Sequence, residues 1–319
     1  LLQVDGPTIQ ILRMKKLSLI LLISMAMNVY AQNRQQLVAL GDSCMREYDF
    51  FHAIQHYQQA QQIRTENKVR LKLAECFYQR NDYHGCSDVL DKVPSDSLNH
   101  NALRQLYYSN SAMKNTSEQL YWGTYIKIRY PMDSKIIADV MGLLVSDSYD
   151  KPEVAVSYGQ DYCLIDSTNI EVNRALGEAY FLNKDYERCV ATYRRLFAEK
   201  DTTYNSLYYM GGAFEYLNQL DSAAFYFTRA VERAPKMAVG NYRLGVVENQ
   251  LGHYENALKY LHNAATLYEP SKFIMFIIYK NMGDAKFNLK DIKAADLYWG
   301  YALAYRDDPE LAKRRQALK

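Results

Sequence analysis

Proline and glycine are scarce in this sequence, with 7 and 14 among 319 residues, against 29 tyrosines. Because these two residues most disfavour the interior of a helix, their scarcity favours a helical chain. Neither charge sign is in excess, since 38 Lys and Arg stand against 36 Asp and Glu. That balance argues against a nucleic-acid-binding protein, which usually carries a broad basic surface. With 49% hydrophobic residues, the chain can still bury a core.

Recognisable catalytic motifs are also absent. The sequence has no G-x-S-x-G motif and no Walker-type glycine loop. His52 and His56 have the spacing of a helical metal-binding pair, but Ala53 stands where the metalloprotease motif needs glutamate. We therefore predict that the protein is not an enzyme and has no cofactor and no metal site. An enzymatic site within residues 101–166 is the less favoured alternative.

An apolar run of 11 residues, 17–27, follows Met14-Lys15-Lys16. The run is too short to span a hydrocarbon core of about 30 Å, and a basic start before such a run is typical of a secretory signal peptide. Val29 and Ala31 supply the small residues that a signal peptidase reads. Ala31-Gln32 stands where a lipoprotein would have its lipidated cysteine, so a lipid anchor is not indicated.

We predict a signal peptide over residues 14–31, with cleavage after Ala31, and a periplasmic or secreted mature protein without a transmembrane span. Residues 1–13 would then be a mis-assigned upstream start. An uncleaved membrane anchor or a buried helix is the alternative for the apolar run.

A repeat of 34 residues is the most informative pattern. An apolar residue followed by glycine recurs at Leu176-Gly177, Met210-Gly211, Leu244-Gly245 and, after 38 residues, Met282-Gly283. Twelve residues after each glycine comes a small residue, namely Cys189, Ala223, Ala257 and Ala295. Four further on comes a large one, namely Tyr193, Phe227, Leu261 and Trp299. The same frame fits Leu40-Gly41 and Leu73-Ala74, and Pro235, Pro270 and Pro309 close three units.

This pattern resembles the tetratricopeptide repeat (TPR) family, whose unit is two antiparallel helices. The resemblance implies an all-α fold, a right-handed α-solenoid of about eight TPR-like helix pairs, because one pair cannot bury its apolar face alone. The large residue is expected to fill the seam with the next unit. We assign units 1–2 to residues 32–98, degenerate units 3–4 to 99–168, units 5–8 to 169–308 and a C-terminal capping helix to 309–319. Residues 101–166 could instead be a joint that divides the array near residue 132.

In TPR proteins the first helix of each pair lines a groove through its second, fifth, ninth, twelfth and thirteenth positions. The resemblance places there Arg174, Glu178, Phe181, Asn205, Tyr208, Glu215, Tyr216, Tyr242, Asn249, Gln250, Lys280, Asp284 and Phe287. Tyrosine and arginine contribute strongly to binding interfaces, although some of these tyrosines could pack between units instead. Carboxylate-binding TPR domains use Lys and Asn at the fifth and ninth positions. Here Arg174/Glu178 and Lys280/Asp284 are expected to neutralise each other, which argues against that mode.

We therefore predict an extracytoplasmic TPR scaffold that binds a protein or peptide segment of unknown identity through a tyrosine-rich groove, within an envelope assembly. A glycan- or peptidoglycan-binding helical repeat protein is the alternative, and nucleic acid is not an expected partner.

Five cysteines would occupy an oxidising compartment if the signal peptide functions. Cys86 and Cys189 stand at the small-residue position, where a free cysteine packs well. A disulfide between Cys76 and Cys86 stays open, because the two fall on facing helices of one unit.

Overall fold

The computed structural model describes residues 31–268 and 271–318. Every regular element in these ranges is helical, and they contain no strand. The predicted residues 1–13 and all of the predicted signal peptide except Ala31 lie outside them. In the described ranges, no helix combines the length and the apolar character needed to cross a bilayer.

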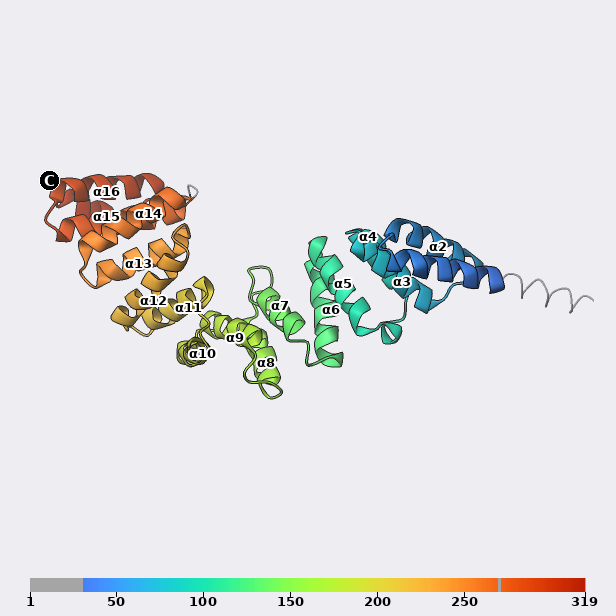
Figure 1. The fold of residues 1–319 in the computed structure, drawn as a ribbon. Coiled ribbons are helices and arrows are strands. Elements are labelled where there is room, and N and C mark those ends of the chain that lie inside the picture. Colours follow the sequence, from blue (N-terminus) through green and yellow to red (C-terminus); the bar gives the residue numbers. More distant parts are fainter. Residues whose placement is uncertain (1–30, 269–270, 319) are drawn as a thin grey trace, which may run out of the picture. The chain divides into compact units, whose positions relative to one another are not determined.

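The chain divides into two compact units, Leu1–Pro131 and Met132–Lys319. In the first unit, residues 31–46 are helical and precede the elements labelled in Figure 1. The unit continues with α2 (Phe50–Ile63), α3 (Asn67–Gln79), α4 (Tyr83–Leu90), the unlabelled 3₁₀ helix η1 (Ser95–Ser97), α5 (His100–Ala112) and α6 (Thr116–Arg129).

The second unit begins with α7 and continues through five helix pairs to a last short helix (Figure 1). Its elements are α7 (Ser134–Leu144), α8 (Pro152–Cys163), α9 (Ile170–Leu182), α10 (Tyr186–Ala198), α11 (Tyr204–Tyr216), α12 (Leu220–Arg233), α13 (Ala238–Gln250), α14 (Tyr254–Leu267), α15 (Lys272–Asn288), α16 (Ile292–Tyr305) and α17 (Pro309–Gln316). With the three pairs of the first unit, the described helices form eight consecutive pairs. The predicted all-α solenoid of about eight helix pairs is therefore confirmed.

Most pairs share one tight turn. A single residue with positive φ stands directly before the N-terminal cap of the second helix in each of the eight pairs, at Tyr48, Asn81, Lys114, Asp150, Lys184, Asn218, Gly252 and Lys290. In four of these turns an aspartate follows and accepts a hydrogen bond from the backbone of the first helical turn, namely Asp49, Asp82, Asp185 and Asp291. Such a cap satisfies a backbone N–H that otherwise has no partner at the helix start, so the turn fixes where each second helix begins.

The contact between the two helices of a pair follows the repeat. A Cβ added at Gly211 would lie 2.8 Å from Cδ1 of the Phe227 ring, and one at Gly177 would lie 2.6 Å from Cζ of Tyr193. The large residue thus covers the glycine of its own pair. It also belongs to the core formed with the first helix of the next pair, as expected, because Tyr57 shares a cluster with Val69 and Leu73 on α3, and Leu261 shares one with Met275 and Ile278 on α15. The small-residue position is fully buried throughout, at Ala53, Cys86, Cys189, Ala223, Ala257 and Ala295.

Residues 101–166 form two helix pairs, α5/α6 and α7/α8, and the boundary between the compact units falls between them. The pair α7/α8 departs from the others. Its turn spans residues 145–151, and a Cβ at Gly142 would have no heavy atom within 4 Å. Gly159 on α8 makes the close contact instead, because a Cβ there would lie 2.7 Å from Cε of Met141.

Candidate functional site

The first helices of the second unit form one continuous layer. Contacts join α7 to α9, α9 to α11, α11 to α13, and α13 to α15. All thirteen predicted groove residues lie on α9, α11, α13 and α15. A partner that runs along this layer would therefore meet residues from several repeats.

A cleft of about 470 Å³ crosses three of these helices, α7, α9 and α11. It brings together three of the predicted groove residues, Arg174, Glu178 and Asn205. Its other lining residues are Lys135, Ala138, Asp139, Gly142, Glu171, Ala175, Tyr193, Thr203, Tyr204 and Ser206. Sequence reasoning missed the α7 contribution, because the frame of the repeat is weakest there.

Arg174 is held by a carboxylate from the turn between α10 and α11. Its Nε donates to Oδ2 of Asp201 at 2.8 Å and its Nη2 to Oδ1 at 2.7 Å, and Ser206 also donates to Asp201 at 3.0 Å. Burial alone would raise the pKa of Asp201, but the hydrogen bonds from Arg174 and Ser206 outweigh it and lower that pKa. The expected pairing of Arg174 with Glu178 is therefore wrong, since a two-point geometry with Asp201 is available.

Glu178 belongs to a series of acids at the ninth repeat position that link one pair to the next. Tyr209 Oη donates to Oε1 of Glu178 at 2.6 Å. In the first unit, Lys72 Nζ lies 2.7 Å from each carboxylate oxygen of Asp42. In both cases the donor is the sixth residue of the following repeat. The pattern explains why an acid recurs at this position.

The other predicted neutral pair, Lys280 with Asp284, is also wrong. Lys280 Nζ lies 3.6 Å from Oδ2 of Asp308, while Asp284 accepts from Arg314 at 2.8 Å and from Trp299 Nε1 at 3.1 Å. Asp284 thus fastens α17 and the buried tryptophan to α15. Phe287 lies beside the same tryptophan, with ring centroids 5.5 Å apart.

A half-buried ion pair joins α11 and α13. Arg243 Nη1 lies 3.3 and 3.4 Å from the two carboxylate oxygens of Glu215. Burial raises the pKa of Glu215 even though Arg243 opposes the shift. Burial alone would lower the pKa of Arg243, but Glu215, Tyr208 and Tyr216 all act to raise it. The repeat frame did not single out Arg243, because it occupies the sixth position.

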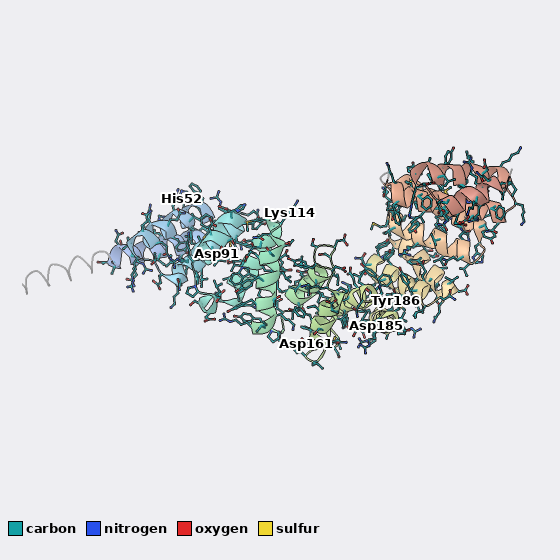
Figure 2. The ribbon with its side chains drawn as sticks, turned by 180° about the vertical axis from the view of Figure 1, so that it is seen from behind. His52, Asp91, Lys114, Asp161, Asp185 and Tyr186 are labelled. Carbon is teal, nitrogen blue, oxygen red and sulfur yellow. The ribbon has the colours of Figure 1, made fainter. Side chains whose placement is uncertain are left out.

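The predicted groove tyrosines divide between packing and exposure. Tyr216 is 54% exposed, whereas Tyr208 and Tyr242 are half-buried. Tyr208 lies over Phe227, with ring centroids 5.8 Å apart. Tyr216 stacks on Tyr186, which begins α10 (Figure 2), at 4.7 Å and an interplanar angle of 4°.

Three further groove residues complete the set. Phe181 supports the Tyr216 ring at 5.8 Å. Asn249 Nδ2 donates to the backbone oxygen of Asn281 at 3.1 Å, which links α13 to α15. Gln250, like Asn205, is exposed.

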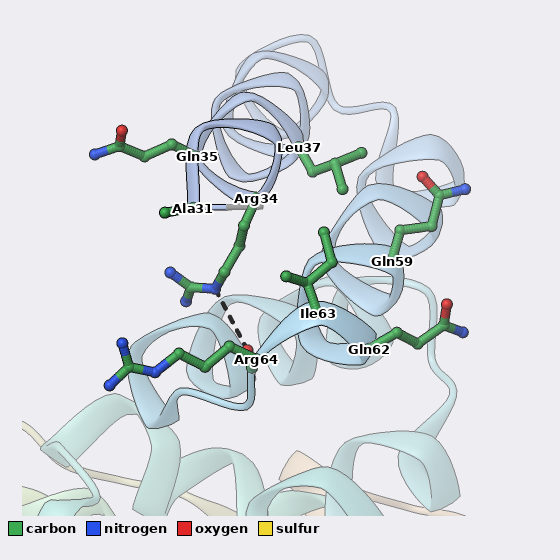
Figure 3. A pocket seen from close by; sticks show the side chains of 8 residues that line it. All are labelled: Ala31, Arg34, Gln35, Leu37, Gln59, Gln62, Ile63 and Arg64. Carbon is green, nitrogen blue, oxygen red and sulfur yellow. Dashed lines mark hydrogen bonds between the residues drawn. The ribbon is translucent and has the colours of Figure 1, made fainter. Parts of the chain in front are cut away.

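A second cavity, of about 870 Å³, lies at the first described residues of the chain (Figure 3). Arg34 Nε donates to the backbone oxygen of Arg64 at 3.3 Å across it. Its described lining residues are glutamine, arginine and aliphatic side chains, and the lining residue Arg34 is paired with Glu66. Because Ala31 lies in the wall, this cavity is at the predicted cleavage point.

The histidines and cysteines form no reactive arrangement in the described residues, where no group of three or more His, Cys, Asp or Glu could hold a metal ion. His52 Nδ1 lies 2.6 Å from Oδ2 of Asp49, the cap of α2. All five cysteines are free thiols, which includes Cys76 and Cys86. Burial raises the pKa of Cys76 to about 12 and that of Cys86 to about 11. Both thiols therefore stay protonated and weakly nucleophilic near neutral pH.

Comparison with known proteins points to one family. Residues 205–236, which include most of α11 and all of α12, match the family model described as tetratricopeptide repeat. No curated protein matches the chain. The crystal structure of YrrB, described as a TPR protein with an unusual peptide-binding site, is similar at a TM-score of 0.52 and 17% identity, over 61% of this chain and 97% of that one.

Two other solved structures are more distant. A tetratricopeptide repeat protein from Parabacteroides merdae ATCC 43184 has a TM-score of 0.49 and 14% identity, over 90% of this chain and 98% of that one. MamA has a TM-score of 0.47 and 18% identity, over 54% of this chain and 91% of that one. The TPR resemblance inferred from the sequence is thus supported by a family match to one repeat and by the fold of YrrB.

Proposed function

We propose that the chain is an interaction scaffold that binds a segment of another protein along the first-helix layer of its second unit. The observation that carries the proposal is the cleft over α7, α9 and α11, because three successive repeats contribute polar side chains to it. TPR proteins bind peptides or proteins, and YrrB is described as having a peptide-binding site.

The lining side chains are held in place before any partner arrives. Asp201 fixes Arg174 at two points, and Tyr209 fixes Glu178. Side chains that are already ordered lose little conformational entropy on binding. Two exposed groups on α11, Asn205 in the cleft and Tyr216 at the far end of the same helix, supply additional contact area.

Gly142 offers a direct test, because it lines the cleft and its Cβ position is open. We expect Gly142→Trp to fill the cleft and abolish recovery of the partner in cross-linked affinity purification, with mass spectrometry of the retained proteins. Ala191→Trp, at an exposed position on α10, is the matched control and should recover the same proteins as wild type. Equal recovery by Gly142→Trp and wild type would refute the proposal.

We further propose that the scaffold acts outside the cytoplasm, in an envelope assembly. The basic start, the apolar run at 17–27 and the small residues before Gln32 support this location. Cell fractionation with N-terminal sequencing tests it: the mature chain should begin at Gln32 in the periplasmic or external fraction. A cytoplasmic chain that keeps residues 14–31 would contradict it.

One observation favours a glycan ligand as the second candidate. Tyr216 is 54% exposed and its ring is held by stacking on Tyr186, and a fixed, exposed aromatic ring is of the kind that packs against sugar rings. Binding of the purified chain to cell-wall material or polysaccharide without any protein, and its loss in Tyr216→Ala, would support this candidate.

A further inference from the structure

The charges that line the α7, α9 and α11 cleft do not balance. Two basic residues, Lys135 and Arg174, face Asp139, Glu171 and Glu178 across the lining, and Asp201 lies behind Arg174. Lys135 Nζ is paired with Asp139 at 2.7 Å, and Arg174 is paired with Asp201. Both cations are therefore already neutralised inside the protein.

The cleft has two further carboxylates, Glu171 and Glu178. Glu178 accepts a hydrogen bond from Tyr209, which is a neutral donor and leaves the negative charge uncompensated. Glu171 is exposed in the first turn of α9. The two side chains are seven residues apart, two turns along the same helix, and both line the cleft. The cleft therefore has a net negative charge.

The uncharged part of the lining suits the stem of a long basic side chain. Ala138, Gly142 and Ala175 give a small, apolar floor, and the half-buried Tyr204 contributes an aromatic ring, while Tyr193 is only 1% exposed and closes the cleft from below. Lysine and arginine bury their methylene groups on such surfaces while the charged end reaches a carboxylate, and aromatic faces also attract cations.

We propose that the cleft receives a lysine or arginine side chain from a basic segment of the partner protein, with Glu171 and Glu178 as the groups that recognise its charge. This inference rests on the proposed scaffold function and names the chemistry of the partner. A segment that presents a carboxylate would meet a cleft of net negative charge whose two cations are already paired, which costs affinity.

The probes are three fluorescein-labelled peptides of about ten residues in which alanine alternates with lysine, glutamine or glutamate, read by fluorescence anisotropy at low salt. We expect the lysine peptide to bind most tightly, and the double variant Glu171→Gln/Glu178→Gln to weaken its binding about tenfold. Glutamine at position 178 can still accept the Tyr209 hydrogen bond, so the variant should fold like wild type. The matched control, Glu187→Gln/Glu199→Gln, removes the same charge from two exposed positions, one in the first turn of α10 and one at its C-cap, and should bind like wild type.

Three results would overturn the inference: equal binding of the glutamine or glutamate peptide, equal weakening by the α10 control variant, or no binding of any peptide. None of these results refutes the scaffold function, which fails only if partner recovery is insensitive to Gly142→Trp. Binding of the glutamine peptide that Gly142→Trp abolishes would keep the scaffold function and reject the charge requirement.

Discussion

The pairs α11/α12 and α7/α8 belong to the same unit, but their glycines at the eighth repeat position have different environments. Gly211 lies under the Phe227 ring, so a side chain there would collide with a buried aromatic group. Gly142 is exposed and has open space where its Cβ would be. The same residue type therefore serves helix packing in one pair and forms the floor of the cleft in the other.

The difference follows from the length of the turn in each pair and from where its two helices come into close contact. The α11/α12 turn spans only residues 217–219, whereas the α7/α8 turn spans 145–151. In α7/α8 the close approach moves to Gly159, which accommodates Met141 and Leu176. The repeat that departs most from the family pattern thus provides part of the candidate binding surface. The comparison shows that a binding cleft can form where a repeat lacks the usual packing contact at its glycine, as at Gly142.

The largest expected effect is a loss of folding stability when the Phe227 ring of the α11/α12 pair is removed. Phe227→Ala removes a fully buried side chain and leaves a cavity, which should lower the free energy of unfolding by about 3–5 kcal/mol. The equivalent change in the other pair, Tyr158→Ala, removes a half-buried side chain and should cost about 1 kcal/mol or less. Urea unfolding followed by circular dichroism measures both. Equal losses would mean that the large residue is packed equally tightly between the two helices of both pairs.

The next largest effect is a loss of stability caused by overpacking at Gly211. Gly211→Ala places a Cβ 2.8 Å from a ring that cannot move freely, so we expect a loss of about 1–3 kcal/mol in unfolding free energy. The same urea titration checks it. An unchanged midpoint would show that α11 and α12 separate easily and that the repeat position does not define their spacing.

The Arg174–Asp201 pair should give a smaller, pH-dependent effect. The folded-state pKa of Asp201 is below its ordinary value of 3.8, so its contribution is fully present above that value and is lost as pH falls through the folded pKa. Asp201→Asn should cost about 1 kcal/mol at neutral pH. The difference from wild type should shrink below about pH 4. A pH-independent difference would show that the aspartate charge has no role.

The smallest effect has the opposite sign. Gly142→Ala replaces a helical glycine at an open position, so it should raise the free energy of unfolding by about 0.5–1 kcal/mol. Differential scanning calorimetry of this variant beside Gly211→Ala checks the sign directly. A destabilised Gly142→Ala would imply a close contact at that glycine and would remove the contrast between the pairs.

Much of the fold follows from spacing alone. The repeat predicts the helix pairs from Leu176 onward, because each apolar-glycine step fixes the register of a first helix and each small residue that of a second. The partners of the charged residues do not follow from it. Arg174 and Lys280 are bonded to Asp201 and Asp308, which lie outside the helices where the repeat pattern applies. Loop conformation decides those pairs, and a sequence period carries no information about it.

The α7 contribution to the cleft was missed for a related physical reason. Lys135, Asp139 and Gly142 lie on a helix whose glycine keeps the phase of the repeat but not its contact. The repeat pattern therefore predicts that α7 is a helix, but it wrongly predicts that Gly142 is packed against the second helix of its pair.

The most direct test of the account is site-specific photo-cross-linking in the cell that makes the protein, with benzoylphenylalanine in place of Asn205 in the cleft or of Phe225 on α12. Both positions are exposed. We predict a protein adduct from position 205 and none from position 225, with the position-205 adduct lost when Gly142→Trp is added. An adduct from position 225 alone, or a position-205 adduct that survives Gly142→Trp, would contradict the claim that the partner occupies the cleft.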